Sequence, residues 1–424
     1  MKRPGPVQLF EHDKLTIDQS GSIFKQRHLD LLEKYHEATG GKYFSLIRNG
    51  IRFCNYVGVI QAGELTIEIL PKPDRNSKDK TLWRAVLLDM LRECHWMQID
   101  THENAQLQLR NNAILDAYFD IFLTACETLL HQGLVRKYRR QEGNCTALKG
   151  RLVFSQHIRR NTVHQEQFYV SHTVYDSNNL YNRILLKAIK LVMHLAPVSL
   201  TDKAGRVLFD WPELPDIGVH EDLFSRIKYD RKTERYREAM EIACMLLLNY
   251  RPDLSHGTQD VLAILFDMNE LWEEFIYRRL KKALLHAYGN GHISRQSRRN
   301  FWQTDNFYKT VRPDIVIHLN GLTTILDTKW KNYDNLRLID DELKQMYVYS
   351  HLWNADRTFL VTPFHDPGVV LRQSGCYHEL QGDTTILGRN SCSWLGVNVV
   401  KAKSETKGKL CPDIGEYLLQ QISL

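Results

Sequence analysis

The stretch that decides the fold of the C-terminal part of this chain is RPDIVIHLNGLTTILDTKWK, residues 312–331. Two mainly apolar runs flank Asn320-Gly321, the dipeptide most typical of a two-residue type I′ turn, so the stretch predicts a β-hairpin. Such a turn places Leu319 opposite Leu322 and thereby sets the register of every other pair in the hairpin.

The predicted hairpin carries charged side chains where a half-buried sheet normally excludes them. Its register places Asp314 opposite Asp327, and side-chain alternation places Lys329 on the same face as Asp327. Like charges that face each other, with Cβ atoms about 5 Å apart, destabilise a sheet. A Mg²⁺ ion held by both carboxylates compensates this repulsion, and Lys329 adds positive charge at the reacting centre. The other interpretation is that Lys329 and Arg312 form plain ion pairs with the aspartates on a solvated edge.

Length and composition narrow the class of protein. The chain has 424 residues, 43% of them hydrophobic and 25% charged, which is ordinary for a soluble protein of two to three domains. No segment has the roughly 18 uninterrupted apolar residues of a membrane span, and no apolar run follows the basic N-terminus as in a secretory signal. The eight cysteines include no C-x-x-C pair, which fits a reducing, cytoplasmic location without a membrane.

Charge and motifs bear on the possible partners. The formal net charge of +6 permits a polyanionic partner but does not require one. The chain contains no G-x-x-x-x-G-K-[ST] motif, so we expect it to bind no nucleotide through a P-loop.

The pattern along the chain predicts a multidomain α+β protein with three domains. Residues 1–78 read as a β-rich N-terminal domain, since residues 51–72 alternate and Ala62-Gly63 separates two extended runs. Residues 79–258 read as a helical scaffold region, because apolar residues recur there at helical spacing. Residues 259–424 read as a mixed α/β domain in the order helix, strand, hairpin, helix, strand, ending in short strand-like pieces.

Two basic segments are candidates for contact with phosphates. The run from residue 136 to residue 160 is dense in Arg and Lys and is either a solvated surface or a phosphate-binding surface. Arg295, Arg298 and Arg299, with Trp302, form a second basic and aromatic group near the hairpin. If these arginines bind DNA, binding weakens with rising salt. Any exposed basic loop has the same pattern.

The acidic and basic residues of the hairpin also resemble a known signature. Pro313-Asp314, then 12 residues, then Asp327-Thr328-Lys329 are similar to the motif of PD-(D/E)xK nucleases. The preceding helix carries Glu273 in NELWEEF. The following helix carries Gln345 and Tyr349 in QMYVY, similar to the RecB-like subgroup of that fold.

Several further blocks, spread in order over residues 50–365, resemble the McrC family. They are YVGVIQAGELTIEILPK, LKGRLVFSQHIRRN, YDSNNLYNRILLKAI, FDMNELWEEFI and LKQMYVYSH. The family comprises the nuclease subunits of McrBC-type, modification-dependent restriction systems. The resemblance implies a C-terminal PD-(D/E)xK nuclease domain that cuts double-stranded DNA with a McrB-like AAA+ GTPase hexamer. It also implies that the partner recognises methylated cytosine, that this chain stimulates the GTPase, and that the N-terminal half docks on the partner.

The resemblance implies roles for the hairpin residues. Asp314 and Asp327 bind Mg²⁺, or Mn²⁺, and the backbone carbonyl of Thr328 is a further ligand. Lys329 positions the attacking water and stabilises charge. Trp330 departs from the pattern, where a smaller aromatic such as Tyr is expected. It should face away from the carboxylates.

The two flanking helices supply the remaining candidates. Glu273 is expected to bind the metal or hold a water, although helical spacing does not separate it from Glu270 or Glu274. Gln345 and Tyr349 support the site or touch the DNA, and ordinary helix packing is the other interpretation.

Two functions follow from the sequence. The first is a Mg²⁺-dependent endodeoxyribonuclease subunit of a GTP-dependent restriction complex acting on methylcytosine-containing DNA. The alternative is a regulatory adaptor that activates an AAA+ GTPase ring without cleavage of its own. The intact set of two aspartates and a lysine favours the first.

Overall fold

The structure of the chain is a computed structural model. The described residues are 5–17, 23–72, 79–96, 114–164, 166–251, 260–289, 292–331, 340–364, 371–381, 384–400 and 410–423. Both predicted domain boundaries, residue 78 and residue 258, lie outside these residues.

The chain divides into two compact units. The first comprises Met1–Pro4 and Asn112–Ile264, and the second comprises Gly5–Asn111 and Leu265–Leu424. The segment predicted to be β-rich therefore belongs to the same compact unit as most of the segment predicted to be mixed α/β.

The first unit is built on packed helices, as expected from the helical spacing of its apolar residues. These helices are α5 (Ile114–His131), α7 (Leu180–Leu195), α8 (Val198–Asp210), α9 (Glu221–Ser225) and α10 (Arg237–Leu248), with the 3-10 turn η1 (Glu234–Tyr236) and the short strand β10 (Tyr250–Arg251). Fully buried Tyr118 and Phe122 of α5 belong to this core.

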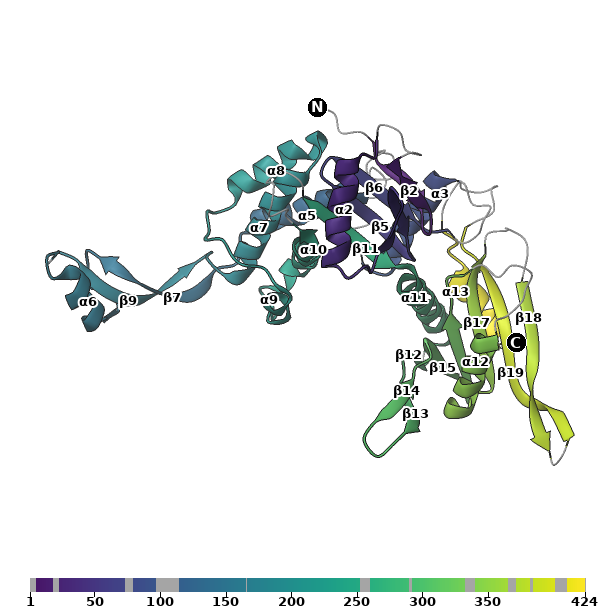
Figure 1. Ribbon diagram of the computed structural model, residues 1–424. Coiled ribbons are helices and arrows are strands. Elements are labelled where there is room, and N and C mark those ends of the chain that lie inside the picture. Colours follow the sequence, from purple (N-terminus) through teal and green to yellow (C-terminus); the bar gives the residue numbers. More distant parts are fainter. Residues whose placement is uncertain are drawn as a thin grey trace. The chain divides into compact units, whose positions relative to one another are not determined.

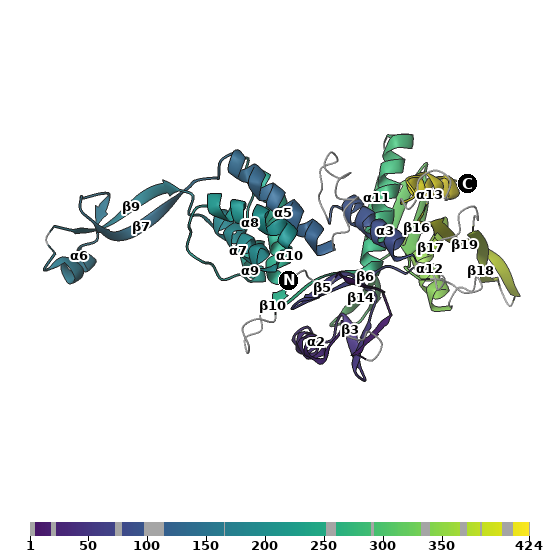
Figure 2. The same cartoon turned by 90° about the horizontal axis from the view of Figure 1, so that it is seen from above.

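A β-arm interrupts the region predicted to be helical, which corrects the prediction there. Strand β7 (Lys137–Cys145) pairs antiparallel with β9 (Phe168–Asp176), and β8 (Arg151–Leu152) pairs with the same strand. Helix α6 (Phe154–Asn161) lies at the far end of the arm, away from the helices of its unit (Figure 1, Figure 2). The run of residues 136–160 is thus mostly a strand and a short helix of this arm.

The N-terminal part of the second unit is β-rich, as predicted. Its elements are β1 (Val7–Phe10), β2 (Lys14–Thr16), α2 (Gln26–Ala38), β3 (Phe44–Ile47), β4 (Gly50–Phe53), β5 (Tyr56–Ala62), β6 (Leu65–Leu70) and α3 (Lys80–Glu93). The predicted hairpin around Ala62-Gly63 is confirmed, since β5 pairs with β6 and Gly63 has a φ of 60°. Strand β1 adds to β6 in parallel, and β2, β4 and β3 form a separate sheet.

The C-terminal part of the second unit is a mixed sheet with helices. Its elements are β11 (Val261–Asp267), which begins in the first unit, α11 (Met268–Tyr288), β12 (His292–Arg295), β13 (Arg299–Gln303), β14 (Tyr308–Val311), β15 (Ile315–Leu319), β16 (Leu322–Thr328), α12 (Asp340–Trp353), β17 (Arg357–Phe364), β18 (Leu371–Gln381), β19 (Thr384–Asn398) and α13 (Ile414–Ser423). Six of these strands form one sheet in the order β12-β15-β16-β17-β19-β18, and β13 and β14 form a separate two-stranded sheet. Asp267 caps α11 by accepting a hydrogen bond from the Asn269 N–H at 2.9 Å.

The order of elements predicted for the C-terminal part is confirmed, with additions. The β13–β14 hairpin lies between β12 and β15 and was not predicted. The terminal segment, read only as short strand-like pieces, forms the two long strands β18 and β19 and helix α13.

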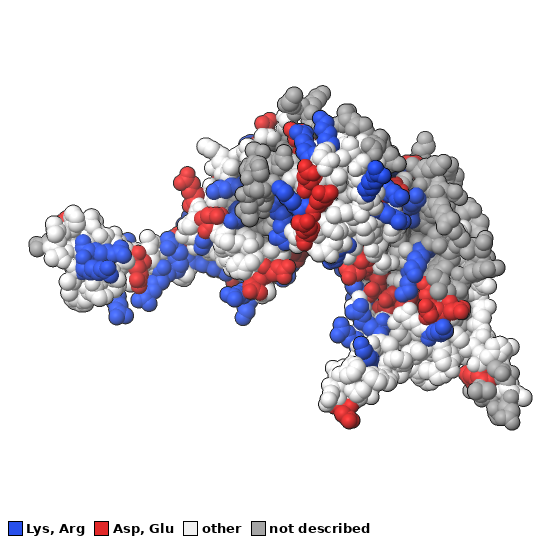
Figure 3. Space-filling model, viewed as in Figure 1, with Lys and Arg blue, Asp and Glu red and all other residues white. Residues whose placement is uncertain are grey.

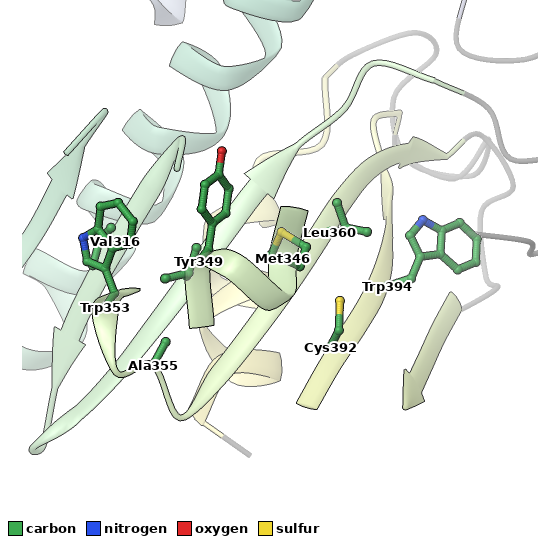
Figure 4. Close-up of a cluster of buried hydrophobic side chains, with 9 residues drawn as sticks. Val316, Met346, Tyr349, Trp353, Ala355, Leu360, Cys392 and Trp394 are labelled. Carbon is green, nitrogen blue, oxygen red and sulfur yellow. The ribbon is translucent and has the colours of Figure 1, made fainter. Parts of the chain in front are cut away.

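Helix α12 is held on the sheet by a buried apolar layer (Figure 4). Its Met346, Tyr349 and Trp353 pack with Val316 of β15, Leu360 of β17, and Cys392 and Trp394 of β19. The Tyr349 hydroxyl points away from the other labelled side chains. The apolar layer therefore fixes the helix that carries Gln345 and Tyr349 relative to the hairpin.

A buried hydrogen bond joins the N-terminal strands to the strand that carries the candidate site. The indole Nε1 of Trp330 donates to Glu11 Oε1 at 2.6 Å, and the Lys72 N–H donates to the same oxygen at 2.7 Å. The Trp330 ring also meets Trp272 of α11 edge-on, with centroids 5.3 Å apart. Trp330 therefore links three parts of the second unit.

The buried Glu11 carboxyl makes stability depend on pH. Burial raises the pKa of Glu11 from 4.5 to about 7, against the opposing effect of its two hydrogen-bond donors. The folded state thus binds the proton more tightly than the unfolded state, so the free energy of unfolding falls as pH rises from about 4.5 to above 7. Glu11→Gln keeps an oxygen acceptor without the charge. As pH rises from about 5 to about 8, the free energy of unfolding of the variant should increase relative to that of the parent by up to about 3 kcal/mol. Chemical denaturation at several pH values measures this difference.

The exposed Glu64, whose side chain is 74% accessible, provides the matched control. Glu64→Gln should leave the pH dependence of unfolding unchanged. Equal pH dependence for the parent and Glu11→Gln would show that Glu11 does not titrate with folding.

The state of the cysteines and the hydropathy of the helices are two further properties of the chain. Cys54, Cys94, Cys126, Cys145, Cys244, Cys376, Cys392 and Cys411 are all free thiols. Among the described residues, no helix combines the length and the apolar character that crossing a bilayer requires.

Candidate functional site

The predicted hairpin is present with the predicted register. Strands β15 and β16 pair from Ile315 with Leu326 to Leu319 with Leu322, as the two-residue turn requires. The turn residues Asn320-Gly321 have φ angles of 51° and 80°, the left-handed conformation of a type I′ turn. The pairing of the two strands begins at Ile315, so Asp314 lies one residue before β15, and Asp327 lies inside β16.

Asp314 is held against the end of the opposite strand. Its Oδ2 accepts hydrogen bonds from the N–H of Thr328 at 2.6 Å and from the Thr328 hydroxyl at 2.9 Å. Its backbone carbonyl accepts from the N–H of Gln296 at 3.0 Å. These bonds fix the position of the Asp314 carboxylate beside β16.

Asp327 is the most deeply buried group of the site. It is 1% exposed and lies on β16, which is covered by β15 on one side and β17 on the other. Its Oδ2 forms an ion pair with Lys329 Nζ at 2.6 Å and accepts no further hydrogen bond from the described residues. A solvated edge, the other interpretation of the charges, is therefore wrong for Asp327. Arg312 instead donates to the Gln296 side chain at 3.2 Å.

Burial and mutual repulsion make the two aspartates reluctant to ionise. Burial raises the pKa of Asp314 to about 7, and the charges of Asp327 and Glu273 add to this effect. Burial also raises the pKa of Asp327, against the opposing charge of Lys329. For Lys329, burial lowers the pKa, but Asp327 and Asp314 outweigh it, so the pKa lies above its ordinary value. The site therefore holds several carboxyl groups that repel one another when ionised, beside one ammonium group that stays protonated.

The structure separates the three glutamates of α11. Glu270 is exposed, and Glu274 pairs with Arg278 and Arg295. Glu273 is 8% exposed, and its charge contributes to the raised pKa of both aspartates. Glu273 is therefore the helix carboxylate that faces the site.

Glu273 is engaged by neighbouring donors. Its Oε1 accepts from Arg295 Nε at 3.0 Å and from Gln296 Nε2 at 2.9 Å. Gln296 thus contacts Glu273, Asp314 and Arg312 together, and it has a left-handed φ of 52°. No sequence motif marks Gln296, because its role depends on contacts between separate elements.

Gln345 and Tyr349 contact the chain just before Asp314. Gln345 Nε2 donates to the Tyr349 hydroxyl at 2.6 Å, and that hydroxyl donates to the Arg312 carbonyl at 3.0 Å. Burial raises the pKa of Tyr349 to about 12, with further contributions from the charges of Asp327 and Asp314. Gln345 and Tyr349 therefore lie where they can hold the backbone that leads to Asp314.

Glu342 of α12 is a further acidic residue near the site that was not singled out in the sequence. It is 6% exposed, pairs with Lys331 at 3.2 Å, and its charge helps to raise the pKa of Asp327. Its place in DDELKQMYVY, on the helix that carries Gln345, was the available signal.

The three candidate DNA-binding arginines do not form one surface. Arg295 points toward Glu273 and Glu274 and is occupied by these carboxylates. Arg299 is exposed, but it donates to the Leu352 carbonyl, and its guanidinium lies 5.0 Å from the centroid of the Trp353 ring. Arg298 is exposed on the segment between β12 and β13.

The carboxylate oxygens of the site fit a hard divalent cation that keeps several of its waters, such as Mg²⁺. Within the described residues, no three His, Cys, Asp or Glu side chains are arranged as a ready metal-binding group. Mg²⁺, however, usually keeps several waters and binds through one or two carboxylates. Asp314 and Asp327 supply two, and the buried Oδ2 of Asp327, whose one partner among the described residues is the Lys329 ammonium, has lone pairs left for a cation.

Comparison with known proteins agrees with this fold. A chain of a Thermococcus gammatolerans assembly, described as McrB AAA+ hexamers with bound McrC, is 19% identical with a TM-score of 0.70, over 98% of this chain and 100% of that one. A chain of a cryo-EM structure of the Thermococcus gammatolerans McrBC complex is 22% identical with a TM-score of 0.52, over 66% of this chain and 88% of that one. No curated protein matches the sequence.

The family comparison covers the candidate site. The family described as "McrBC 5-methylcytosine restriction system component" matches residues 51–363, which include α11, the β15–β16 hairpin and α12. Because this match spans more than half of the sequence, the chain belongs to the family of McrBC 5-methylcytosine restriction system components.

Proposed function

We propose that the chain is the nuclease subunit of a McrBC-type restriction complex, a Mg²⁺-dependent endodeoxyribonuclease acting on duplex DNA that contains 5-methylcytosine. The observation that carries the proposal is the group of a buried Asp327 with the partly buried Asp314 and Lys329 on a PD-(D/E)xK-like hairpin, in a member of this family. Mn²⁺ is the alternative ion.

Each residue of the site has a definite task in phosphodiester hydrolysis. Asp314 and Asp327 hold the cation, with the Thr328 carbonyl as a further oxygen ligand and Glu273 as a ligand or water-holding group. When bound, Mg²⁺ supplies charge neutralisation at the phosphate and acidifies a water. Lys329 remains protonated because its pKa is raised, so it stabilises developing negative charge and orients the water as a donor.

We infer that cleavage needs a McrB-like AAA+ GTPase hexamer. The similar Thermococcus gammatolerans assembly is described as McrB AAA+ hexamers with bound McrC. The present chain carries no P-loop motif, so nucleotide-driven translocation belongs to the partner. The chain itself stimulates the GTPase of the ring.

The β7–β9 arm favours the adaptor function as a second role of the same chain. Four large apolar residues near the end of the arm are highly exposed, namely Leu148 at 62%, Phe154 at 68%, Ile158 at 65% and Val163 at 84%. Exposed apolar groups gathered in this way are typical of protein–protein contact sites. We therefore place a contact with the ring at the end of the arm, in addition to docking by residues 1–78.

The test of the proposed function is cleavage of 5-methylcytosine-containing duplex DNA by the full chain with a McrB-like partner, GTP and Mg²⁺. Cleavage that requires all four components supports the proposal. GTPase stimulation without any cleavage, under Mg²⁺ and under Mn²⁺, would leave only the adaptor function.

Removal of the Tyr349 hydroxyl should weaken catalysis without unfolding the site. In Tyr349→Phe, the Arg312 carbonyl loses its donor and the segment that leads to Asp314 is less firmly held. Losing a group that orients metal ligands typically costs 10- to 100-fold, so we expect the single-turnover cleavage rate to fall by about 10-fold or more.

Tyr347→Phe, on the same helix at 36% exposure, is the matched control and should cleave normally. An unchanged rate for Tyr349→Phe would assign Gln345 and Tyr349 to ordinary helix packing.

A further inference from the structure

The β13–β14 hairpin carries large aromatic side chains in solvent. Strand β13 pairs antiparallel with β14, with an irregularity between Asn300 and Trp302. Phe301 is 53% exposed, Trp302 50%, Phe307 50% and Tyr308 61%. The hairpin forms its own two-stranded sheet and projects beyond β12 and β15 (Figure 1).

Packing within the hairpin accounts for only part of this composition. Trp302 and Phe307 meet edge-on with ring centroids 5.3 Å apart, a cross-strand contact that stabilises a two-stranded ribbon. A pair of this kind does not require Phe301 and Tyr308 to be aromatic as well. Four half-exposed rings on one short hairpin indicate a surface that another molecule covers.

Basic side chains accompany these rings. Lys309 lies on β14, with its Nζ 5.8 Å from the centroid of the Phe307 ring. Arg298 and Arg299 precede the rings, Arg312 follows them, and all three are exposed. In Figure 3, Lys and Arg atoms gather at the base of the hairpin, and its outer part is mostly uncharged. Basic residues beside stackable rings are the combination that binds phosphates and bases together.

The base of the hairpin is anchored to the candidate site. Strand β14 ends at Val311, three residues before Asp314. The Arg312 carbonyl is held by Tyr349, and the Arg312 side chain donates to Gln296. On the other strand, Arg299 donates to the Leu352 carbonyl at the end of α12. A molecule bound by this hairpin is therefore held close to the two aspartates.

We propose that the β13–β14 hairpin enters a groove of the DNA duplex beside the scissile phosphate and stacks Trp302 and Phe307 against an opened base step. Lys309 and Arg298 bind the flanking phosphates. A two-stranded β-ribbon fits a DNA groove, and apolar side chains that enter a base step unstack it. The inference rests on the proposed nuclease function. Duplex DNA is the occupant that the basic residues on either side of the rings and the proximity to Asp314 favour over a protein surface.

The test compares DNA binding by the full chain in complex with a McrB-like partner. The probe is a duplex with 2-aminopurine at successive positions, whose fluorescence rises when its base unstacks. We expect Trp302→Ala/Phe307→Ala to lower DNA affinity by roughly tenfold, because stacking on a ring contributes substantially per base. The variant should lose the fluorescence rise and keep the salt dependence of binding.

Two further variants make the assignment specific. Lys309→Gln should reduce the slope of affinity against salt by about one phosphate contact and keep the fluorescence rise. Leu387→Ala changes an apolar residue that is 68% exposed on β19 of the same unit, and it should match the parent in both measurements.

Either of two results would overturn the inference. One is parental DNA affinity and fluorescence in Trp302→Ala/Phe307→Ala. The other is loss of partner association or GTPase stimulation in that variant with DNA binding intact, which would make the hairpin a partner contact. Failure of the nuclease proposal is distinguishable, because the parent would then unstack the probe without cutting methylated DNA.

Discussion

Asp327→Asn is expected to abolish DNA cleavage, lowering the rate by at least about 10²- to 10³-fold, while GTPase stimulation stays at the parental level. The substitution is nearly isosteric and removes the charge that holds the cation. Asp327 is 1% exposed and its pKa is raised by burial, so loss of this buried charge should not destabilise the fold. The measurements are single-turnover cleavage of methylated duplex DNA and GTP hydrolysis by the partner, with the same protein preparation.

Two comparisons make this result interpretable. Asp341→Asn, at a side chain that is 90% exposed on α12, should cleave at the parental rate. Lys329→Ala, like Asp327→Asn, should lose DNA cleavage and keep the parental level of GTPase stimulation. Continued cutting by both Asp327→Asn and Lys329→Ala would mean that the catalytic residues lie elsewhere.

Shortening the β7–β9 arm is expected to abolish GTPase stimulation, and with it GTP-dependent cleavage. Arg140 and Thr173 are paired across the two strands, so an Asn-Gly turn can join them and remove the end of the arm. The base is retained, including the Arg139–Asp176 ion pair at 2.9 Å, and the helices of the first unit keep their core. The expected loss follows from removal of the exposed apolar residues, because a few such anchors supply most of the binding energy of an interface.

The measurement is GTP hydrolysis by the partner, titrated with full-length or shortened chain, after thermal unfolding shows equal stability. Phe154→Ser alone should raise the concentration needed for stimulation by about tenfold or more if Phe154 is an anchor. Phe209→Ser, at 89% exposure on α8 of the same unit, is the matched control and should have no effect. Full stimulation by the shortened chain would place the ring contact outside the arm.

Features that depend only on residues close together in the sequence could be predicted from the sequence. The Asn320-Gly321 turn determined the register of β15 and β16, because only residues that tolerate a positive φ close a two-residue turn and alternation then assigns every side chain to a face. The candidates Asp314, Asp327 and Lys329 came from this local geometry together with the resemblance to nucleases.

The β-arm escaped sequence analysis because almost none of its residues are buried. Strand β7 alternates between partly and fully exposed residues, so no apolar face marks it as a strand. Apolar residues recur at a regular period only where one face of an element is buried, so an element that projects into solvent shows no such period.

Only the tertiary structure decided which charged residues face the site. Glu270, Glu273 and Glu274 share one turn of helix, and burial and ion pairing select Glu273. Arg295 was predicted to bind DNA, yet it is occupied by glutamates of α11.

The grouping of residues 5–111 with residues 265–424 likewise required the structure. It depends on contacts such as Trp330 with Glu11, which are 319 positions apart in the chain. A sequence pattern records the period of burial along one element. The partner that buries each face comes from elsewhere in the chain, so it is determined only when the elements pack.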